Sequence, residues 1–249
     1  MLHFFLFMCT VSQQTQQHLG DKYLVQISEI NGKIQQIYHD FELNKLKPYN
    51  QSAFQKLINE IKAEKSALTD VKFEVTNLLS TIVSYSLLDK VYLEFARIMT
   101  DSYADALNQI AFEILGNQFG IAQFKPTQVS DEINVATALL KGKFDRIVMN
   151  LIDIDTRVAT IMSGKNLTTD LLNELRVLDE LTIVMKDATV LKTDLYMTYL
   201  RESEQITLSG KELSILQKNE VDLHLLMLDW LIQFCSTYQT LVKRLMGNF

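Results

Sequence analysis

The sequence predicts an all-α protein, an elongated bundle of about six long amphipathic helices. Residues that interrupt helices are scarce: the 249 residues include 2 Pro and 8 Gly. Turn-rich β folds need many more of both. Apolar residues recur in alternating steps of three and four, the spacing of one helix face. The connections between these stripes are short, which favours antiparallel neighbours, an up-and-down order and coiled-coil-like packing.

Residues 1–12 resemble a signal peptide. An apolar run from Leu2 to Val11 ends at Ser12, and Thr10 and Ser12 are the small residues that precede a cleavage site, although no basic residue comes first. The alternative is an N-terminal turn packed into the core. Cleavage would remove Cys9, and the remaining Cys235 lies in an apolar stretch that predicts a buried, unreactive thiol.

The N-terminal half, residues 13–118, predicts about three helices. Its first stripe is Tyr23, Ile27, Ile30, Ile34, Ile37 and Phe41. Pro48 interrupts, and Ser52 with Gln55 forms a capping-box pattern that starts the next helix. The stripe that follows runs from Phe54 to Tyr85 and a further one from Leu88 to Ile110, with Gly116 as the left-handed stop. The pattern leaves open whether a turn at 86–89 separates these two helices.

A connecting loop, residues 119–129, leads to the C-terminal half, residues 130–249, which also predicts about three helices. The cleanest stripe of the chain is Ile133, Thr137, Leu140, Phe144, Ile147, Leu151, Ile154, Val158 and Ile161. A less regular helix covers about residues 170–203, through Leu178, Leu181, Met185 and Leu195. The last helix follows a capping box at Ser209 and Glu212 and carries Leu223, Met227, Trp230, Phe234, Tyr238 and Leu241 on its stripe. The halves could pack as one domain or as two.

The composition excludes several functions. A net charge of −6 and an isoelectric point near 5.3 leave no basic field, so nucleic acid is not an expected partner. The chain has no Gly-rich phosphate loop, no paired-cysteine motif and no H-E-x-x-H pattern. We therefore expect no catalytic residues, no cofactor and no metal.

Three groups of polar residues resemble functional motifs and are interpreted otherwise. Glu220 and His224 share a helix face, but two ligands are too few for a metal, so a surface pair is predicted. His39 beside Asp40 is read in the same way. The string from Asp153 to Thr156 is similar to the aspartate motif of haloacid dehalogenase-type phosphotransferases. That motif requires the end of a strand, whereas this one lies in a helical stripe, so Asp153 and Asp155 are predicted to face solvent.

Two glycosylation sequons, at Asn50 and Asn166, fall in predicted connections, which suits a secreted chain. The sequence thus favours a secreted, non-enzymatic binding or effector protein for a protein partner or small apolar ligand. In general character it is similar to extracellular effectors of arthropod saliva or body fluids.

Two alternatives stay open. A membrane-active or lipid-binding helical protein is less favoured, because the apolar stretch 223–242 contains several polar residues. An intracellular coiled-coil scaffold would require the N-terminal run to remain attached. Helix stripes left free after intramolecular packing could also serve self-association.

Overall fold

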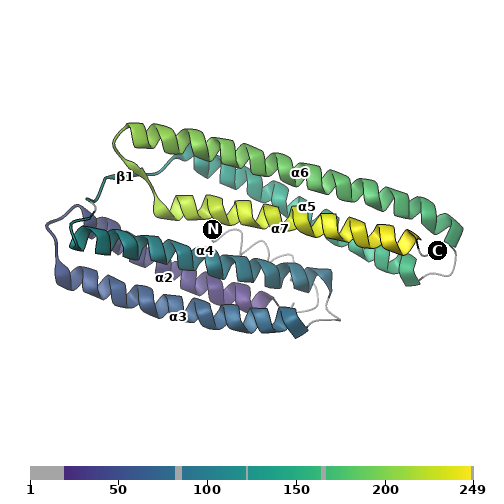
Figure 1. Ribbon diagram of the computed structural model, residues 1–249, viewed down its shortest axis with the longest axis horizontal. Helices are drawn as coiled ribbons and strands as arrows, with labels where there is room; N and C mark the ends of the chain where they lie inside the picture. Colours follow the sequence, from purple (N-terminus) through teal and green to yellow (C-terminus); the bar gives the residue numbers. More distant parts are fainter. Residues whose placement is uncertain (1–19, 82–85, 122, 164–166, 248–249) are drawn as a thin grey trace. The chain divides into compact units, whose positions relative to one another are not determined.

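The computed structural model describes residues 20–81, 86–121, 123–163 and 167–247, with side chains except at 161–175 and 245–247. The predicted all-α class is confirmed (Figure 1). The described helices are α2 (Asp21–Lys45), α3 (Gln51–Thr81), α4 (Leu87–Gln118), α5 (Asp131–Ser163), α6 (Leu167–Leu208) and α7 (Ile215–Gly247). Two short strands, β1 (Thr127–Gln128) and β2 (Glu212–Leu213), join them. The predicted signal peptide lies outside the described residues.

The described chain divides into two compact units. Unit 1 contains the described residues up to Asp131 and the segment Leu200–Leu223, and unit 2 contains Glu132–Tyr199 and the described residues from His224 onward. The segment Leu200–Leu223 therefore returns to the unit formed by the first three described helices, which no feature of the sequence indicated.

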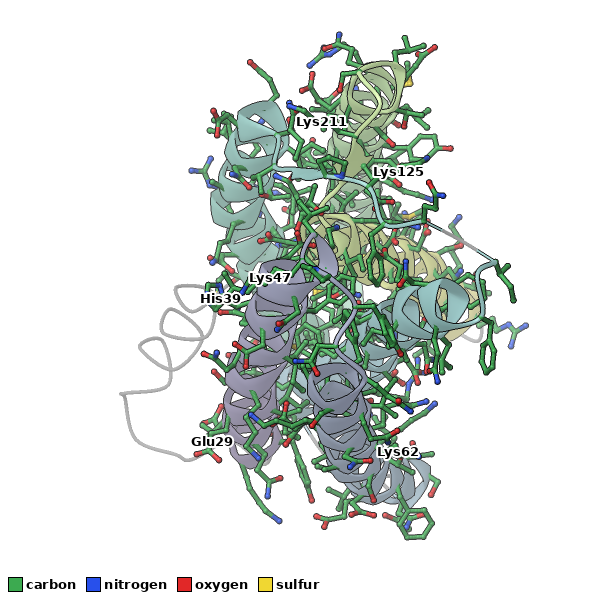
Figure 2. All side chains as sticks on the ribbon, turned by 90° about the vertical axis from the view of Figure 1, so that its left-hand side faces the viewer. Glu29, His39, Lys47, Lys62, Lys125 and Lys211 are labelled. Carbon is green, nitrogen blue, oxygen red and sulfur yellow. The ribbon has the colours of Figure 1, made fainter. Side chains whose placement is uncertain are left out.

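In unit 1, α2, α3 and α4 lie side by side and run antiparallel in sequence order (Figure 1). The direction follows from four polar pairs: Lys22 with Glu74 (3.3 Å), Lys33 with Glu64 (3.2 Å), Lys65 with Asn108 (2.6 Å) and Lys72 with Asp101 (2.5 Å). In each helix pair, one residue number rises as its partner's falls. Between the helices lies the core, where the whole predicted stripe from Tyr23 to Phe41 is buried, while Glu29 and Lys62 are exposed (Figure 2).

Unit 2 packs α5 against the parts of α6 and α7 that belong to it. Lys192 on α6 bonds Asp229 on α7 (2.5 Å), and Gln239 on α7 bonds Thr182 on α6 (2.8 Å), so these two helices are antiparallel. The α5 stripe from Ile133 to Ile154 is buried as predicted.

The stripes predicted for α6 and α7 are wrong in part. On the part of α6 that belongs to unit 2 the buried residues are Val177, Leu181, Val184, Ala188, Leu191 and Leu195, whereas Leu178 and Met185 of the predicted stripe are only half-buried. On α7 Leu231, Cys235 and Val242 are buried, whereas Leu241 is 49% exposed. The half-buried Trp230, Phe234 and Tyr238 stack in series along α7, with ring centroids 5.2 and 5.7 Å apart.

Several predicted helix ends differ from the observed ones. The N-cap of α3 is Asn50, whose Oδ1 accepts from the Ala53 backbone N–H (3.2 Å), and not Ser52. Gly116 is buried inside α4, and the left-handed residue after that helix is Gly120, with φ of 67°. The turn left open at 86–89 is a helix start, because the Ser86 Oγ accepts from the Asp89 backbone N–H (3.2 Å).

The second predicted capping box is also wrong, because Glu212 lies in β2 and not in a helix. Gly210, with φ of 77°, turns the chain after α6, and β2 then pairs in parallel with β1, Thr127 opposite Glu212. A short parallel pair thus ties the segment between α4 and α5 to the segment between α6 and α7, within unit 1.

Candidate functional site

A groove runs between α5 and α6 in unit 2. Two cavities of about 280 and 290 Å³ follow one another along it and share Asn150 in their walls. The floor consists of buried side chains, Ile147 and Ile154 of α5 with Val184 and Leu191 of α6. Side chains that point outward complete the walls, so the groove is apolar at its base and open along its length.

Two large apolar side chains form the exposed lip of this groove. Ile183 is 57% and Val190 48% exposed, and the two are separated by two helical turns on α6. An aliphatic side chain gains about 1.5–3 kcal/mol when it leaves water completely, so a stripe of this kind favours a covering partner. We therefore treat the α5–α6 groove as the candidate functional site.

One end of the groove is closed by a network of charges. The Arg157 guanidinium bonds both carboxylate oxygens of Glu180 and lies 3.0 Å from Asp153 Oδ2, and Arg176 lies 3.0 Å from Glu180. The hydrogen bond from Arg157 is the main cause that lowers the pKa of the Glu180 carboxyl, since it stabilises the charged form. This network fixes the position of α5 against α6.

The other end of the groove is mainly basic. Lys143 and Arg146 are exposed on α5, opposite Asp187 on α6. A partner with one or two carboxylates would meet complementary charge here.

A second polar cluster lies in unit 1 around Lys45, whose side chain is 1% exposed. Its Nζ donates to Thr127 Oγ1 and lies 3.0 Å from Glu42 Oε1 and 3.7 Å from Glu212 Oε1. Lys45 also sits 5.4 Å from the centre of the Phe41 ring. A buried ammonium requires such partners, so the cluster fastens β1 and β2 to the end of α2.

Glu113 of α4 belongs to the same cluster. The pKa of its carboxyl is raised to about 7, mainly by burial; the nearby Glu212 and Glu42 add to the rise, and Lys45 opposes it. One of its oxygens, Oε2, is buried without a hydrogen bond among the described residues. The cluster contains one cation and three carboxyls, and burial of Glu113 among them favours the protonated form of its carboxyl.

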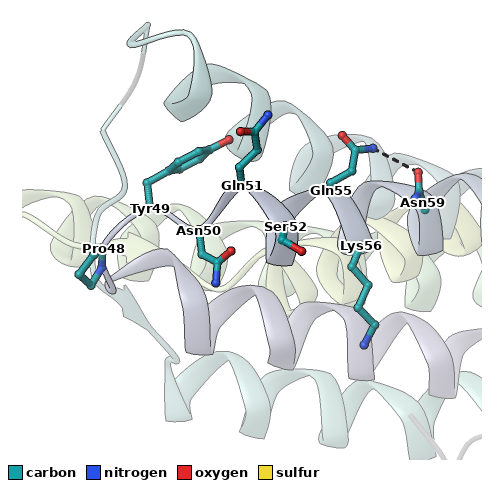
Figure 3. Close-up of a pocket in the computed structure, with 8 residues that line it drawn as sticks. All are labelled: Pro48, Tyr49, Asn50, Gln51, Ser52, Gln55, Lys56 and Asn59. Atoms are coloured by element: carbon teal, nitrogen blue, oxygen red, sulfur yellow. Dashed lines mark hydrogen bonds between the residues drawn. The ribbon is translucent and has the colours of Figure 1, made fainter.

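The described sequon, Asn50, lies in a wide open surface depression lined by exposed residues (Figure 3). Pro48 and Tyr49 form one side, and Gln55, which bonds Asn59 at 3.3 Å, lies along α3. The Asn50 side chain is thus accessible to a glycan, although it also caps α3. The other sequon residue, Asn166, lies outside the described residues.

The remaining candidates do not assemble into a site. His224 is 7% exposed, so the predicted surface pair with Glu220 is wrong for the histidine, whereas His39 is exposed. Asp153 is exposed as predicted, but Asp155 is half-buried and accepts a hydrogen bond from the Tyr238 hydroxyl (2.6 Å). Among the described residues no three His, Cys, Asp or Glu side chains gather as metal ligands.

Cys235 is fully buried, as predicted, and burial raises the pKa of its thiol to about 12. A thiol with so little thiolate is a poor nucleophile. Within the described chain, no helix combines the length and the hydropathy needed to cross a bilayer.

Comparison with known proteins returned no matching family model, no matching curated protein and no matching solved structure.

Proposed function

We propose that this protein is a secreted, non-enzymatic binding protein, and that the α5–α6 groove of unit 2 receives a helical segment of a protein partner. The observation that supports this proposal is the exposed lip of Ile183 and Val190 above a buried apolar floor. Amphipathic helices bind such grooves through apolar residues at steps of three, four and seven.

The dimensions favour a helix over a small apolar ligand. Ligand sites enclose most of the molecule they bind and usually measure about 300–1,000 Å³. Each cavity in the groove is just below that range and open to solvent, whereas together they form a track about three to four helical turns long. A partner helix would place apolar residues over Ile183 and Val190 and acidic residues beside Lys143 and Arg146.

Helical peptides selected by display against the full chain test this function. The variant I183E/V190E places two charges on the lip, and we expect it to weaken the selected peptides at least about tenfold, since each contact loses more than about 1 kcal/mol. The matched control V135E/L139E changes two equally exposed aliphatic residues of α5 outside the groove and should leave affinity unchanged. Peptides that bind both variants as tightly as the wild type would refute the assignment.

The secreted address is a separate part of the proposal. It rests on the apolar leader and on the accessibility of Asn50. Intact mass and N-terminal sequencing of protein from its native source should give a start near Gln13 and added mass at Asn50 or Asn166. A chain that begins at Met1 without a glycan would favour the intracellular scaffold instead.

A further inference from the structure

Three loops of unit 1 lie at the same end of that unit. They are residues 46–50 after α2, residues 119–121 and 123–126 after α4, and residues 208–211, which begin with the last residue of α6, and we call them together the loop end. The pairing of β1 with β2 joins two of them, and the Glu212 backbone N–H donates to the Pro126 carbonyl oxygen (3.0 Å). The contacts of Lys45 with Glu42, Thr127 and Glu212 bind the end of α2 to the same place.

One aromatic side chain anchors the longest loop. The Phe124 ring centre lies 5.6 Å from that of Phe41 and 5.7 Å from that of Phe54, so it packs against both α2 and α3. The residues before it, Phe119 and Ile121, do not follow it inward. Phe124 therefore anchors the loop in the core of unit 1, while Phe119 and Ile121 remain exposed to solvent.

Each loop carries exposed apolar side chains. Phe119 is 69%, Ile121 79% and Leu208 81% exposed, and Leu46 and Tyr49 are exposed as well. They project from three separate loops and form no continuous helix stripe. A helical partner would bind a groove or a continuous stripe of apolar side chains. Apolar side chains on several separate loops favour binding to a lipid interface, into which all of them can insert at the same time.

Each loop also carries one lysine. Lys47, Lys125 and Lys211 are exposed, and none makes an ion pair within the described residues (Figure 2). The three loop segments contain no Asp or Glu, although the whole chain has a net charge of −6. The loop end is therefore a locally cationic, apolar surface on an acidic protein.

We propose that the loop end docks on the surface of an anionic lipid bilayer. The loop lysines face the acidic headgroups, and Phe119, Ile121 and Leu208 enter the interface. Interfacial binding of this type depends jointly on buried apolar area and on attraction to anionic lipid. It needs no spanning helix, and it uses a surface of unit 1 that is distinct from the groove of unit 2.

Co-sedimentation of the full chain with vesicles tests the proposal. Vesicles of phosphatidylcholine with about one-third phosphatidylserine should bind the protein, pure phosphatidylcholine should bind it weakly, and high salt should release it. The variant K47Q/K125Q/K211Q should lower the partition coefficient about a hundredfold, since each lysine near such a surface contributes about fivefold. The variant F119Q/I121Q should lower it at least about tenfold.

The matched controls come from α3 of the same unit. F73Q removes a phenylalanine that is 67% exposed, and K62Q removes an exposed lysine, so neither should change vesicle binding. The proposal is overturned if the wild type does not bind anionic vesicles, which is the result expected if the loop end binds a protein partner. It is also overturned if the control variants lose vesicle binding to the same extent as the loop variants. Because all changed side chains are exposed, circular dichroism spectra should match the wild type.

Discussion

Replacing Glu113 with Gln should stabilise unit 1 at slightly alkaline pH and leave it nearly unchanged at acidic pH. The pKa of this carboxyl is raised from 4.5 to about 7, mainly by burial. A raised carboxyl pKa means that the folded state favours the protonated form. Its contribution to stability is complete below about pH 4.5 and is lost as the pH rises through about 7. Gln resembles the protonated carboxyl in shape and cannot ionise.

The magnitude follows from the pKa difference between the folded and the unfolded chain. Each unit corresponds to 1.36 kcal/mol, so the upper limit above pH 7 is about 3 kcal/mol. Glu113 is half-buried and solvent screens part of this penalty, which leaves about 1–2 kcal/mol as the expected gain for E113Q at about pH 8. At about pH 5 the expected difference is a few tenths of a kcal/mol.

Urea unfolding followed by far-UV circular dichroism at the two pH values measures this gain. Tryptophan fluorescence would not report on the unfolding of unit 1, because the one tryptophan of the chain, Trp230, lies in unit 2. Comparing variant with wild type at each pH cancels the titration of other carboxyls. The control E29Q changes an exposed carboxylate of α2 and should give no such difference. An E113Q effect that is equal at both pH values, or a loss of stability at pH 8, would refute the reasoning.

Three further predictions concern buried polar groups. Lys45→Met should lower the stability of unit 1 by about 2 kcal/mol in urea unfolding, because it leaves two part-buried carboxylates without their cation. The control Lys62→Met changes an exposed lysine and should have almost no effect. Equal effects of the two changes would contradict the stabilising role of Lys45. The Cys235 thiol should react with a disulfide reagent only in urea, so rapid labelling of the native chain at pH 8 would show that it is accessible. Tyr238→Phe removes the hydrogen bond to Asp155 and should lower the stability of unit 2 by about 1 kcal/mol. Urea unfolding followed by Trp230 fluorescence measures this loss, and an unchanged stability would show that the bond does not form in solution.

The sequence predicted the helices well where one apolar stripe dominates. The stripes of α2 and α5 are buried almost residue by residue, because their opposite faces are polar. In α7 the aromatic series beginning at Trp230 and the aliphatic series beginning at Leu231 lie one position apart, and both have the spacing of a helix face. Periodicity does not rank them, and only the packing of unit 2 shows that Leu231 and Cys235 are the buried ones.

The sequence did not predict the features that position the loop end. Two-residue strands have no period, so the pairing of Thr127 with Glu212, far apart in the chain, left no signal. The sequence could not predict the burial of Lys45 either, since a lysine is normally exposed. Its partners Glu42, Thr127 and Glu212 come from three separate segments of the chain. Near Pro48 both Asn50 and Ser52 are good N-cap residues, and the choice depends on where α3 begins.

The proposed binding site in the α5–α6 groove is tested most directly by hydrogen exchange of the full chain, with and without a saturating display-selected helical peptide. Backbone amides in folded helices exchange through local opening, and a bound partner suppresses that opening where it packs. We predict added protection in residues 143–157 of α5 and 180–191 of α6, with none in α2, α3 or α4. Protection confined to unit 1, or spread evenly over the chain, would contradict the assignment of the groove.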